Sequence, residues 1–430
     1  MSNHGAIVKR RYRNLCHKAR FVSSEREAEQ DLELERHKEI IRALKGELNH
    51  IRSSRAYRLA VAIQALKAKV KTRVGSISAS ISKSAPASAD SLSTHVAKST
   101  LRIAYLIPGR GISGGTAVVL QHLNRLKERG FETFIIDTMN QSGRLDWFPN
   151  QQVEIRSLEE IPHDLDVAVA TGWQTVHHLE GMAAHQKYYF VQSDETRFTD
   201  DPDTKAYIRA TYEKPFKYFT EARWIQRWLK AEFGHDSFYA PNGLDPELIH
   251  PTVPLTPRGE RLRVLLEGPI GIPFKGMADA FAAVGPLDCE IWCVSSYRPP
   301  RPSWRCDRFF QAVPLDQMKF IYSSCDILLK MSRVEGFFGP PLEMMACGGV
   351  PVVSKVTGYD EYIVDGENAL VVEMGDVRGA REAVRCLLED GDLRARLQEG
   401  GRQTAALWRW KETIDHLERA FTLVGNVEER

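Results

Sequence analysis

Two glutamates, Glu335 and Glu343, stand eight positions apart in the stretch SRVEGFFGPPLEMMACGGVPVVS, residues 332–354. The apolar run before this stretch predicts a strand that ends at its first residue. Proline is favoured at the first helical position, so Pro341 predicts the start of a helix with Glu343 in its first turn. Glycine readily adopts the left-handed conformation of a helix cap, which places the helix end at Gly348–Gly349. We therefore expect both carboxylates at the carboxyl edge of a sheet.

The helix start determines what chemistry this stretch can perform. Its free N–H groups and partial positive charge suit a phosphate, and Gly336 and Gly339, with Phe338 between them, let the backbone approach it closely. Because a carboxylate repels a phosphate, Glu343 is expected to accept hydrogen bonds from ribose hydroxyls. Glu335 would reach the group beyond the phosphates, binding sugar hydroxyls or stabilising positive charge at an anomeric carbon. In the alternative interpretation, Glu343 only complements the helix dipole and Glu335 is a solvated loop residue.

The elements that position these glutamates form two series of strands alternating with helical patterns. The first series holds LRIAYLI, FETFIID, DVAVATG and KYYFVQS, and the second holds RLRVLLEG, CEIWCVS, DILLKM, VPVVS and ALVVE. The alternation predicts α/β domains with parallel sheets, whose ligands bind beyond the carboxyl ends of the strands. The segment PNGLDPELIHP divides the two series. We expect two Rossmann-like domains facing a cleft, residues 101–245 and 246–405, followed by a helix within 406–430.

The basic charge of the chain is concentrated in residues 1–73, which hold 18 Lys and Arg against 8 Asp and Glu, a net charge of +10. The remainder holds 40 against 48, a net charge of −8. Apolar residues at a spacing of three and four predict a helical or coiled-coil arm. Its basic face favours an anionic membrane surface or self-association, whereas no nucleic-acid motif is visible. Residues 74–100, rich in Ser and Ala, are interpreted as a linker.

Length, cysteines and competing motifs exclude several classes of protein. A chain of 430 residues predicts two or three domains. The seven cysteines form no C-x-x-C pair, which indicates core thiols. No signal peptide and no apolar run of about 18 residues are visible, so we expect a cytoplasmic protein. We interpret Asp201-Pro202-Asp203 as a surface turn and the pair His177-His178 as non-catalytic, and we expect no metal.

The E-x7-E spacing followed by MACGGVPVVS resembles the signature of group 1 (family 4) retaining glycosyltransferases, which have the GT-B fold. The resemblance extends over about residues 101–425 and is strongest near the two glutamates. It implies that Glu343 binds the nucleotide ribose and that Glu335 lies against the donor sugar. ISGGT resembles the family's N-terminal glycine loop, so Gly114 and Gly115 are expected beside the donor phosphates. WRWKETIDHLERAF resembles the final helix, which crosses back to the N-terminal domain.

One departure from the family concerns the cations that neutralise the diphosphate. Lys275, before a glycine, matches the family's lysine, but Pro269 stands where an arginine is common. Arg223, in TEARW, is a candidate replacement. Lys330 and Arg333, on either side of the strand end before Glu335, are two others.

The segments KYYFVQSDETRF and VATGWQT resemble rhamnosyltransferases that build bacterial surface glycans. Four residues at strand ends of the N-terminal domain are the expected acceptor-binding residues: Trp173, Gln192, Asp194 and Glu195. The resemblance implies a retaining, metal-independent enzyme that transfers a hexose or deoxyhexose, such as rhamnose, from a nucleoside-diphosphate sugar to a glycan or lipid-linked acceptor, without a cofactor. It would work in the cytoplasm, or peripherally at the inner face of the cell membrane. Two alternatives remain open: a nucleotide-sugar epimerase and a non-catalytic, membrane-recruited scaffold.

Overall fold

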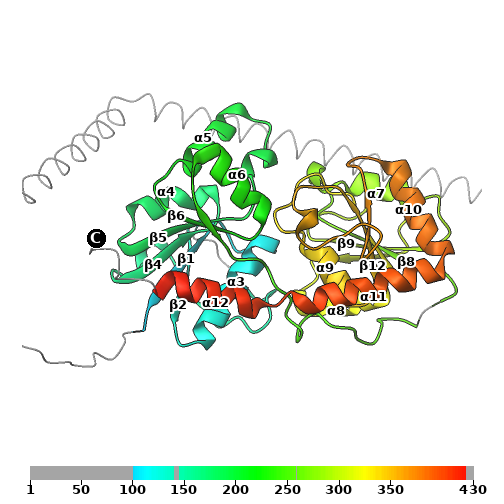
Figure 1. Ribbon diagram of the computed structural model, residues 1–430, viewed down its shortest axis with the longest axis horizontal. Helices are drawn as coiled ribbons and strands as arrows, with labels where there is room; N and C mark the ends of the chain where they lie inside the picture. The colour runs from blue at the N-terminus through cyan, green and yellow to red at the C-terminus, as the bar shows by residue number, and fades with distance from the viewer. Residues whose placement is uncertain (1–99, 140–144, 258, 423–430) are drawn as a thin grey trace, which may run out of the picture. The chain divides into compact units, whose positions relative to one another are not determined.

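A computed structural model describes residues 100–139, 145–257 and 259–422 of the chain, which lie in one compact unit. The predicted basic arm, residues 1–73, and all but the last residue of the predicted linker lie outside the described residues. Two parallel sheets, each covered by helices, make up the described part (Figure 1). The predicted α/β class is confirmed.

The first sheet has seven parallel strands in the order β3-β2-β1-β4-β5-β6-β7. Their bounds are β1 Arg102–Ile107, β2 Glu132–Asp137, β3 Glu154–Arg156, β4 Leu165–Ala170, β5 Ala184–Val191, β6 Lys217–Thr220 and β7 Ser237–Tyr239. Successive residues of β1 point to opposite faces: Ile103, Tyr105 and Ile107 lie in one core cluster, and Ala104 and Leu106 in another. A parallel sheet buried on both faces needs such continuous apolar strands.

The elements associated with the first sheet include one from the far end of the sequence. Those between its strands are α3 Gly114–Glu128, η1 Leu158–Glu160, α4 Trp173–Gly181, η2 Glu195–Phe198, α5 Pro202–Tyr212 and α6 Arg223–Phe233. The last helix, α12 (Trp410–Thr422), lies beside α3 (Figure 1). Its Ile414, Leu417 and Phe421 are buried in the same cluster as β1. The end of the described chain therefore packs on the N-terminal domain.

The second sheet has six parallel strands in the order β10-β9-β8-β11-β12-β13. Their bounds are β8 Arg263–Glu267, β9 Glu290–Ser295, β10 Arg308–Gln311, β11 Ile327–Lys330, β12 Val350–Ser354 and β13 Leu370–Val372. The remaining helical elements are η3 Pro273–Lys275, α7 Met277–Val284, α8 Leu315–Ser324, α9 Gly339–Ala346, η4 Tyr359–Glu361, α10 Val377–Glu389 and α11 Gly391–Leu407. Two core clusters, one on each face, hold this sheet between its helices.

The strand order of each sheet reverses direction at one point. In the first sheet β1 lies between β2 and β4, and in the second β8 lies between β9 and β11. Ligands of open α/β sheets bind outside the carboxyl ends of strands at such a point. The loops after β1, β4, β8 and β11 are therefore the places to look for a site.

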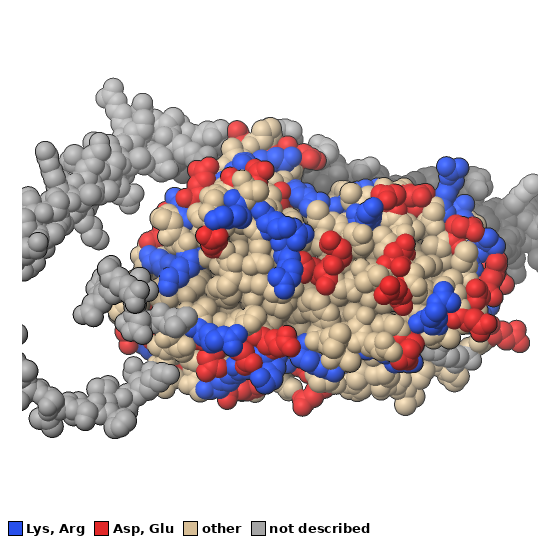
Figure 2. Space-filling model, in the orientation of Figure 1, with Lys and Arg blue, Asp and Glu red and all other residues tan. Residues whose placement is uncertain are grey.

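The surface charge does not indicate a binding site as the strand order does. On the face shown in Figure 2, basic and acidic side chains are interspersed over the described part. Among the described helices, none is long and apolar enough to cross a membrane.

Candidate active site

The loop between β11 and α9 carries Glu335, whose exposed fraction is 8%. Its Oε2 accepts a hydrogen bond from Lys275 Nζ at 2.8 Å, whereas Oε1 has no hydrogen-bond partner among the described residues. Burial by itself would raise the pKa of Glu335, but the ammonium groups of Lys275 and Lys330 outweigh it and hold that pKa below its usual range. The site therefore contains an ionised carboxylate with one buried oxygen that has no hydrogen-bond partner among the described residues.

A second buried cation, Lys330, ends the strand that leads to Glu335. Its Nζ donates to the backbone carbonyl of Glu267 at 3.0 Å and forms an ion pair with the Glu267 carboxylate. Burial opposes the charge of Lys330, but Glu267 and Glu335 together raise its pKa above the usual value. Glu267 ends β8, the neighbouring strand, so the switch point of the second sheet holds a fixed ammonium group.

Glu343 lies on α9, which begins at Gly339 with prolines in its first turn. The helix starts two residues before the predicted Pro341, so Glu343 lies beyond the first turn, where the N-terminal dipole is weaker. Tyr322, on α8, donates a hydrogen bond to Glu343 Oε2 at 2.8 Å. Burial, with a contribution from the Glu267 charge, raises the pKa of Glu343 to about 7. The Glu343 carboxyl can accept or donate a hydrogen bond near neutral pH.

Gly336, next to Glu335, brings this loop against the first sheet. A β-carbon there would lie 1.8 Å from the backbone oxygen of Gln192 and 2.7 Å from Glu221 Oε1. Trp224 Nε1 donates to the carbonyl of Gly336 at 2.9 Å, and the N–H of Phe337 donates to Glu221 Oε1 at 3.0 Å. Only glycine allows this approach, which places the Glu335 loop directly on the carboxyl ends of β5 and β6.

Glu221 was not predicted as a site residue. It is 5% exposed and also accepts a hydrogen bond from Asn242 Nδ2 at 2.9 Å. Burial, with smaller contributions from Glu335 and Glu361, raises its pKa to about 8. Its position directly after an apolar strand, in TEARW, was the available signal, but the partners come from distant parts of the chain.

A cavity of about 430 Å³ lies at the carboxyl edge of the first sheet. Three of the four predicted acceptor-binding residues line it, namely Trp173, Gln192 and Glu195. The other lining residues are Pro108, Ser113, Gly115, Thr116, Thr171, Gly172, Gln174, Phe198, Thr199, Thr204 and Ile208. All the polar side chains in this list carry hydroxyl or amide groups.

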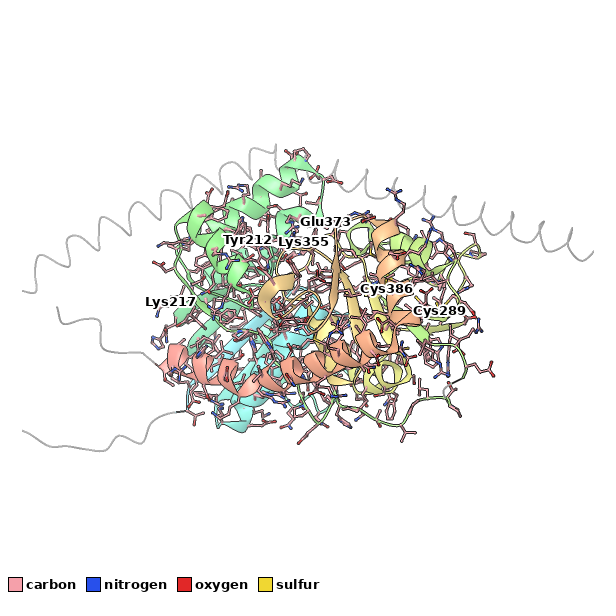
Figure 3. All side chains as sticks on the ribbon, turned by 45° about the vertical axis from the view of Figure 1, so that its right-hand side comes forward. Tyr212, Lys217, Cys289, Lys355, Glu373 and Cys386 are labelled. Atoms are coloured by element: carbon pink, nitrogen blue, oxygen red, sulfur yellow. The ribbon has the colours of Figure 1, made fainter. Side chains whose placement is uncertain are left out.

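Glu195 is the one carboxylate among the described lining residues of this cavity. Its Oε2 accepts hydrogen bonds from the Tyr189 hydroxyl at 2.8 Å, the Trp173 N–H at 3.1 Å and the Tyr212 hydroxyl at 3.3 Å. Tyr212, at the end of α5, is labelled in Figure 3. Burial raises the pKa of Glu195 to about 7. Because Oε1 accepts no hydrogen bond from any described residue, it remains available to a ligand.

Two contacts connect the cavity with the Glu335 loop. The side chain of Gln192 lines the cavity while its backbone oxygen packs on Gly336. The ring of Phe198, also in the cavity wall, stacks on that of Phe274 with a centroid distance of 5.1 Å. Phe274 directly precedes Lys275 in the sequence. The cavity and the Lys275–Glu335 pair are thus neighbours, although they belong to different sheets.

Several predicted residues lie nearby in other surroundings. The Asp194 side chain accepts a hydrogen bond from the Thr196 N–H at 3.1 Å, so it caps η2, and it is not among the described lining residues. Arg223 is exposed, and its guanidinium lies over the Tyr239 ring at 4.2 Å. No contact from Arg223 to Glu335 is present among the described residues.

The predicted glycines occupy both helix starts. Gly114 is the first residue of α3 and Gly339 the first of α9, and a β-carbon at either would meet nothing within 4 Å. Gly115 faces Gln192, whose Oε1 would lie 3.0 Å from a β-carbon there. Phe338 is fully buried, and its carbonyl accepts a hydrogen bond from the Tyr362 hydroxyl. Its contribution to a site is therefore through packing and backbone position.

The competing motifs have ordinary structural roles. Asp201 caps α5, accepting a hydrogen bond from the Thr204 N–H at 2.9 Å, and Pro202 is the first residue of that helix. His177 and His178 lie on α4 with ring centroids 3.8 Å apart, outside the cavity lining. Within the described ranges, no group of three or more His, Cys, Asp or Glu residues could hold a metal ion.

Comparison with known protein sequences finds a family match that covers four strands of the second sheet, β10 to β13. Residues 308–404 match the family model described as glycosyl transferases group 1. The chain is 25% identical over 270 residues to the O-antigen biosynthesis protein RfbC of Myxococcus xanthus, covering 60% of this chain and 21% of that protein. It spans 30% of the length of each of two further curated relatives. The predicted resemblance to group 1 glycosyltransferases is confirmed.

Solved structures match both sheets together. Alr3699/HepE of Anabaena, in complex with UDP-glucose, superposes with a TM-score of 0.62 at 13% identity, covering 74% of this chain and 99% of that one. WaaG, a glycosyltransferase involved in lipopolysaccharide biosynthesis, gives a TM-score of 0.61 at 14% identity, with coverage of 74% and 99%. The predicted GT-B fold is confirmed.

Proposed function

We propose that this chain, with its GT-B fold and its match to group 1 glycosyl transferases, is a retaining, metal-independent glycosyltransferase. It transfers a hexose or deoxyhexose, such as rhamnose, from a nucleoside-diphosphate sugar to a glycan or glycolipid acceptor in surface polysaccharide assembly. The observation that supports this proposal most is the Lys275–Glu335 pair, whose second carboxylate oxygen is buried without a hydrogen-bond partner among the described residues, beside a cavity of the other domain. An O-antigen protein and a lipopolysaccharide glycosyltransferase among the similar proteins support the surface-glycan assignment, and the HepE complex with UDP-glucose supports a nucleotide-sugar donor.

In this proposal the second sheet holds the donor. Lys275 faces the diphosphate, and the free N–H groups at the start of α9 add donors for its oxygens. Lys330 contributes positive potential from behind Glu335, in place of the arginine that Pro269 replaces. Glu343 accepts hydrogen bonds from the ribose hydroxyls, and the free Oε1 of Glu335 faces the donor sugar.

The first sheet holds the acceptor in its cavity. The bond between the anomeric carbon and the leaving phosphate oxygen breaks, and the acceptor oxygen forms its bond on the same face of the sugar. The leaving phosphate oxygen takes the acceptor proton, so no enzyme nucleophile is required. The Glu335 carboxylate stabilises the positive charge that develops at the anomeric carbon. Contact of the Glu335 loop with Gln192 excludes water from between donor and acceptor.

Thermal unfolding with a panel of nucleoside diphosphates and their sugars tests donor binding. A ligand at 100 times its Kd adds about 2.7 kcal/mol to the free energy of unfolding, which for a domain of this size raises the Tm by roughly 5–10 °C. We expect one base and sugar to give the largest shift, and Glu343→Ala to reduce it. Product analysis with donor alone identifies an epimerase instead. If no nucleotide shifts the Tm, the scaffold alternative is favoured.

We also propose that the basic arm, residues 1–73, brings the enzyme to an anionic membrane surface. Its charge of +10 supports this proposal, since each basic residue near an anionic surface contributes about 1 kcal/mol. Sedimentation with vesicles of neutral and anionic lipid measures the effect. Equal binding to anionic vesicles by the full chain and by a chain beginning at residue 74 would leave self-association as the arm's role.

A further inference from the structure

The cavity of the first sheet has an unusual charge composition for a site next to a diphosphate. No Lys, Arg or His is found among its described lining residues, and its one charged side chain is the carboxylate of Glu195. The remaining polar groups are hydroxyls and amides, which hydrogen-bond to neutral ligands without favouring an anion. The starts of α3 and α4 also line the cavity and carry a partial positive charge, but Ser113 already caps α3, and Glu195 accepts a hydrogen bond from the Trp173 N–H at the start of α4. A phosphate or carboxylate bound here would therefore lose its hydration without gaining a full counter-charge from any described side chain of the lining.

The orientation of Glu195 strengthens this argument. Three donors, from Trp173, Tyr189 and Tyr212, converge on Oε2 and fix the carboxyl group in one position. Its Oε1 is left for the ligand and lies close to the backbone at Gly172, where a β-carbon would be 3.4 Å from it. A fixed carboxylate oxygen accepts a hydrogen bond from a ligand hydroxyl and repels a ligand anion.

Two aromatic rings give the same cavity an apolar surface. Trp173 and Phe198 both line it, and Phe198 is 44% exposed. Flat aromatic surface buries the apolar C–H groups of a sugar ring, while hydroxyls and amides take its oxygens. A ring bound there would also lie next to Gln192, whose backbone packs on the Glu335 loop.

We propose that the sugar ring held in this cavity is neutral and unphosphorylated, and that Glu195 accepts a hydrogen bond from one of its hydroxyls. The enzyme thus extends a plain glycan end and discriminates against acceptor rings that carry a phosphate or a carboxylate. This inference rests on the proposed glycosyltransferase function and specifies the acceptor class of its N-terminal site.

The test compares matched acceptors on the full chain with the donor found by thermal unfolding. A panel of methyl hexosides and methyl 6-deoxyhexosides is assayed beside the hexose 6-phosphates and uronosides of the same rings, at about pH 8, above the pKa of Glu195. The readout is acceptor-dependent release of nucleoside diphosphate above donor hydrolysis. We expect kcat/KM for a neutral ring to exceed that of its anionic partner by about tenfold or more, as for one charge repulsion in a partly buried site.

Variants assign this preference to the cavity. Glu195→Gln keeps an oxygen acceptor of the same size but removes the charge, so the anionic-to-neutral ratio of kcat/KM should rise about tenfold. Gln174→Lys, at an exposed lining position, adds a cation and should raise the ratio even if Glu195→Gln folds poorly. Glu213→Gln removes an exposed carboxylate after α5 and should leave the ratio unchanged.

The outcomes separate this inference from the function it rests on. Wild-type enzyme that prefers the anionic partner, or uses both equally, overturns the inference. So does a donor that is bound and hydrolysed while no neutral ring accelerates its turnover. A chain that binds and hydrolyses no nucleotide sugar instead overturns the proposed function.

Discussion

The carboxyl edges of the two sheets each hold a glutamate, in different electrostatic surroundings. At the second sheet, two ammonium groups, those of Lys275 and Lys330, surround Glu335 and keep it ionised. At the first sheet, Glu195 has only neutral hydrogen-bond donors, and burial raises its pKa to about 7. In the proposed function, the cationic edge binds the diphosphate and the edge with Glu195 binds a neutral ligand. A few side chains at the strand ends account for this difference in charge between the two edges. Four variants test it.

Glu335→Gln should have the largest effect on transfer, because it removes the carboxylate charge that Lys275 and Lys330 stabilise. We expect kcat for transfer to fall about 10²–10³-fold, as when one group that stabilises developing charge is lost. Donor binding should persist, because Lys275 and Lys330 remain. Steady-state turnover and donor titration separate these two effects.

The control for this variant is Glu373→Gln, which changes an exposed carboxylate of the same domain. Glu373 pairs with Lys355 at 3.5 Å, and both are labelled in Figure 3. We expect its kcat to match wild type. A wild-type kcat in Glu335→Gln would remove Glu335 from the mechanism.

Lys275→Met tests the cation itself. The side chain of Lys275 is 21% exposed and that of Glu335 10%, so the pair is largely withdrawn from water. Its loss removes the proposed phosphate ligand and leaves Glu335 with Lys330 as its principal counter-charge. We expect the Kd for nucleoside diphosphate to rise about 100-fold, or about 3 kcal/mol. Calorimetric titration measures it, with Lys355→Met as the exposed control, and an unchanged Kd would contradict the assignment.

Gly336→Ala tests the contact between the Glu335 loop of the second sheet and Gln192 of the first. The added β-carbon would lie 1.8 Å from the backbone oxygen of Gln192, so the Glu335 loop must move away from the cavity. A displacement of about 1 Å can cost up to 10²-fold in rate, and we expect roughly a tenfold loss of kcat. Gly181→Ala is the matched control, since a β-carbon there meets nothing within 4 Å. Equal kcat values for the two variants would show that the contact is dispensable.

Local sequence patterns explain which parts of the fold were predictable. Central parallel strands are buried on both faces and appear as continuous apolar runs, so the nine expected strands are present. Four strands were not predicted. The edge strands β3, β7 and β10 are three or four residues long and are mostly half-buried or exposed, and β6, although mostly buried, is only four residues long. Their pairing depends on neighbours that the local pattern does not specify.

The site was predictable where spacing along one loop determines position. The strand, the glycines and the prolines placed Glu335 on the loop and Glu343 on the helix, although the helix begins two residues earlier than predicted and Glu343 lies beyond its first turn. Glu221 could not be placed in this way, because its partner Phe337 is 116 residues away and the contact depends on how the two sheets pack. The pairing of Lys330 with Glu267 is likewise a property of adjacent strands.

Glu221→Gln is the variant with the smallest expected effect. It tests the contact between Glu221 and the Glu335 loop through the pH dependence of stability. Burial raises the pKa of Glu221 to about 8, above the value of about 4.3 for an unfolded chain. Between about pH 5 and pH 8 the folded protein therefore binds a proton that the unfolded chain releases, and stability falls as pH rises. Glutamine keeps an oxygen for the Phe337 N–H but cannot ionise, so its Tm should fall less steeply than that of wild type.

The measurement is Tm against pH for wild type, Glu221→Gln and the exposed control Glu213→Gln. We expect the difference between Glu221→Gln and wild type to grow by a few degrees from pH 5 to pH 8, in favour of the variant. Some slope should remain, because Glu195 and Glu343 also have pKa values of about 7. Parallel curves would mean that Glu221 is already ionised beside Glu335. The contact between Glu221 and the Glu335 loop would then hold two negative charges. The change from a cationic to an uncharged environment would in that case lie at Gly336 and not at the cavity.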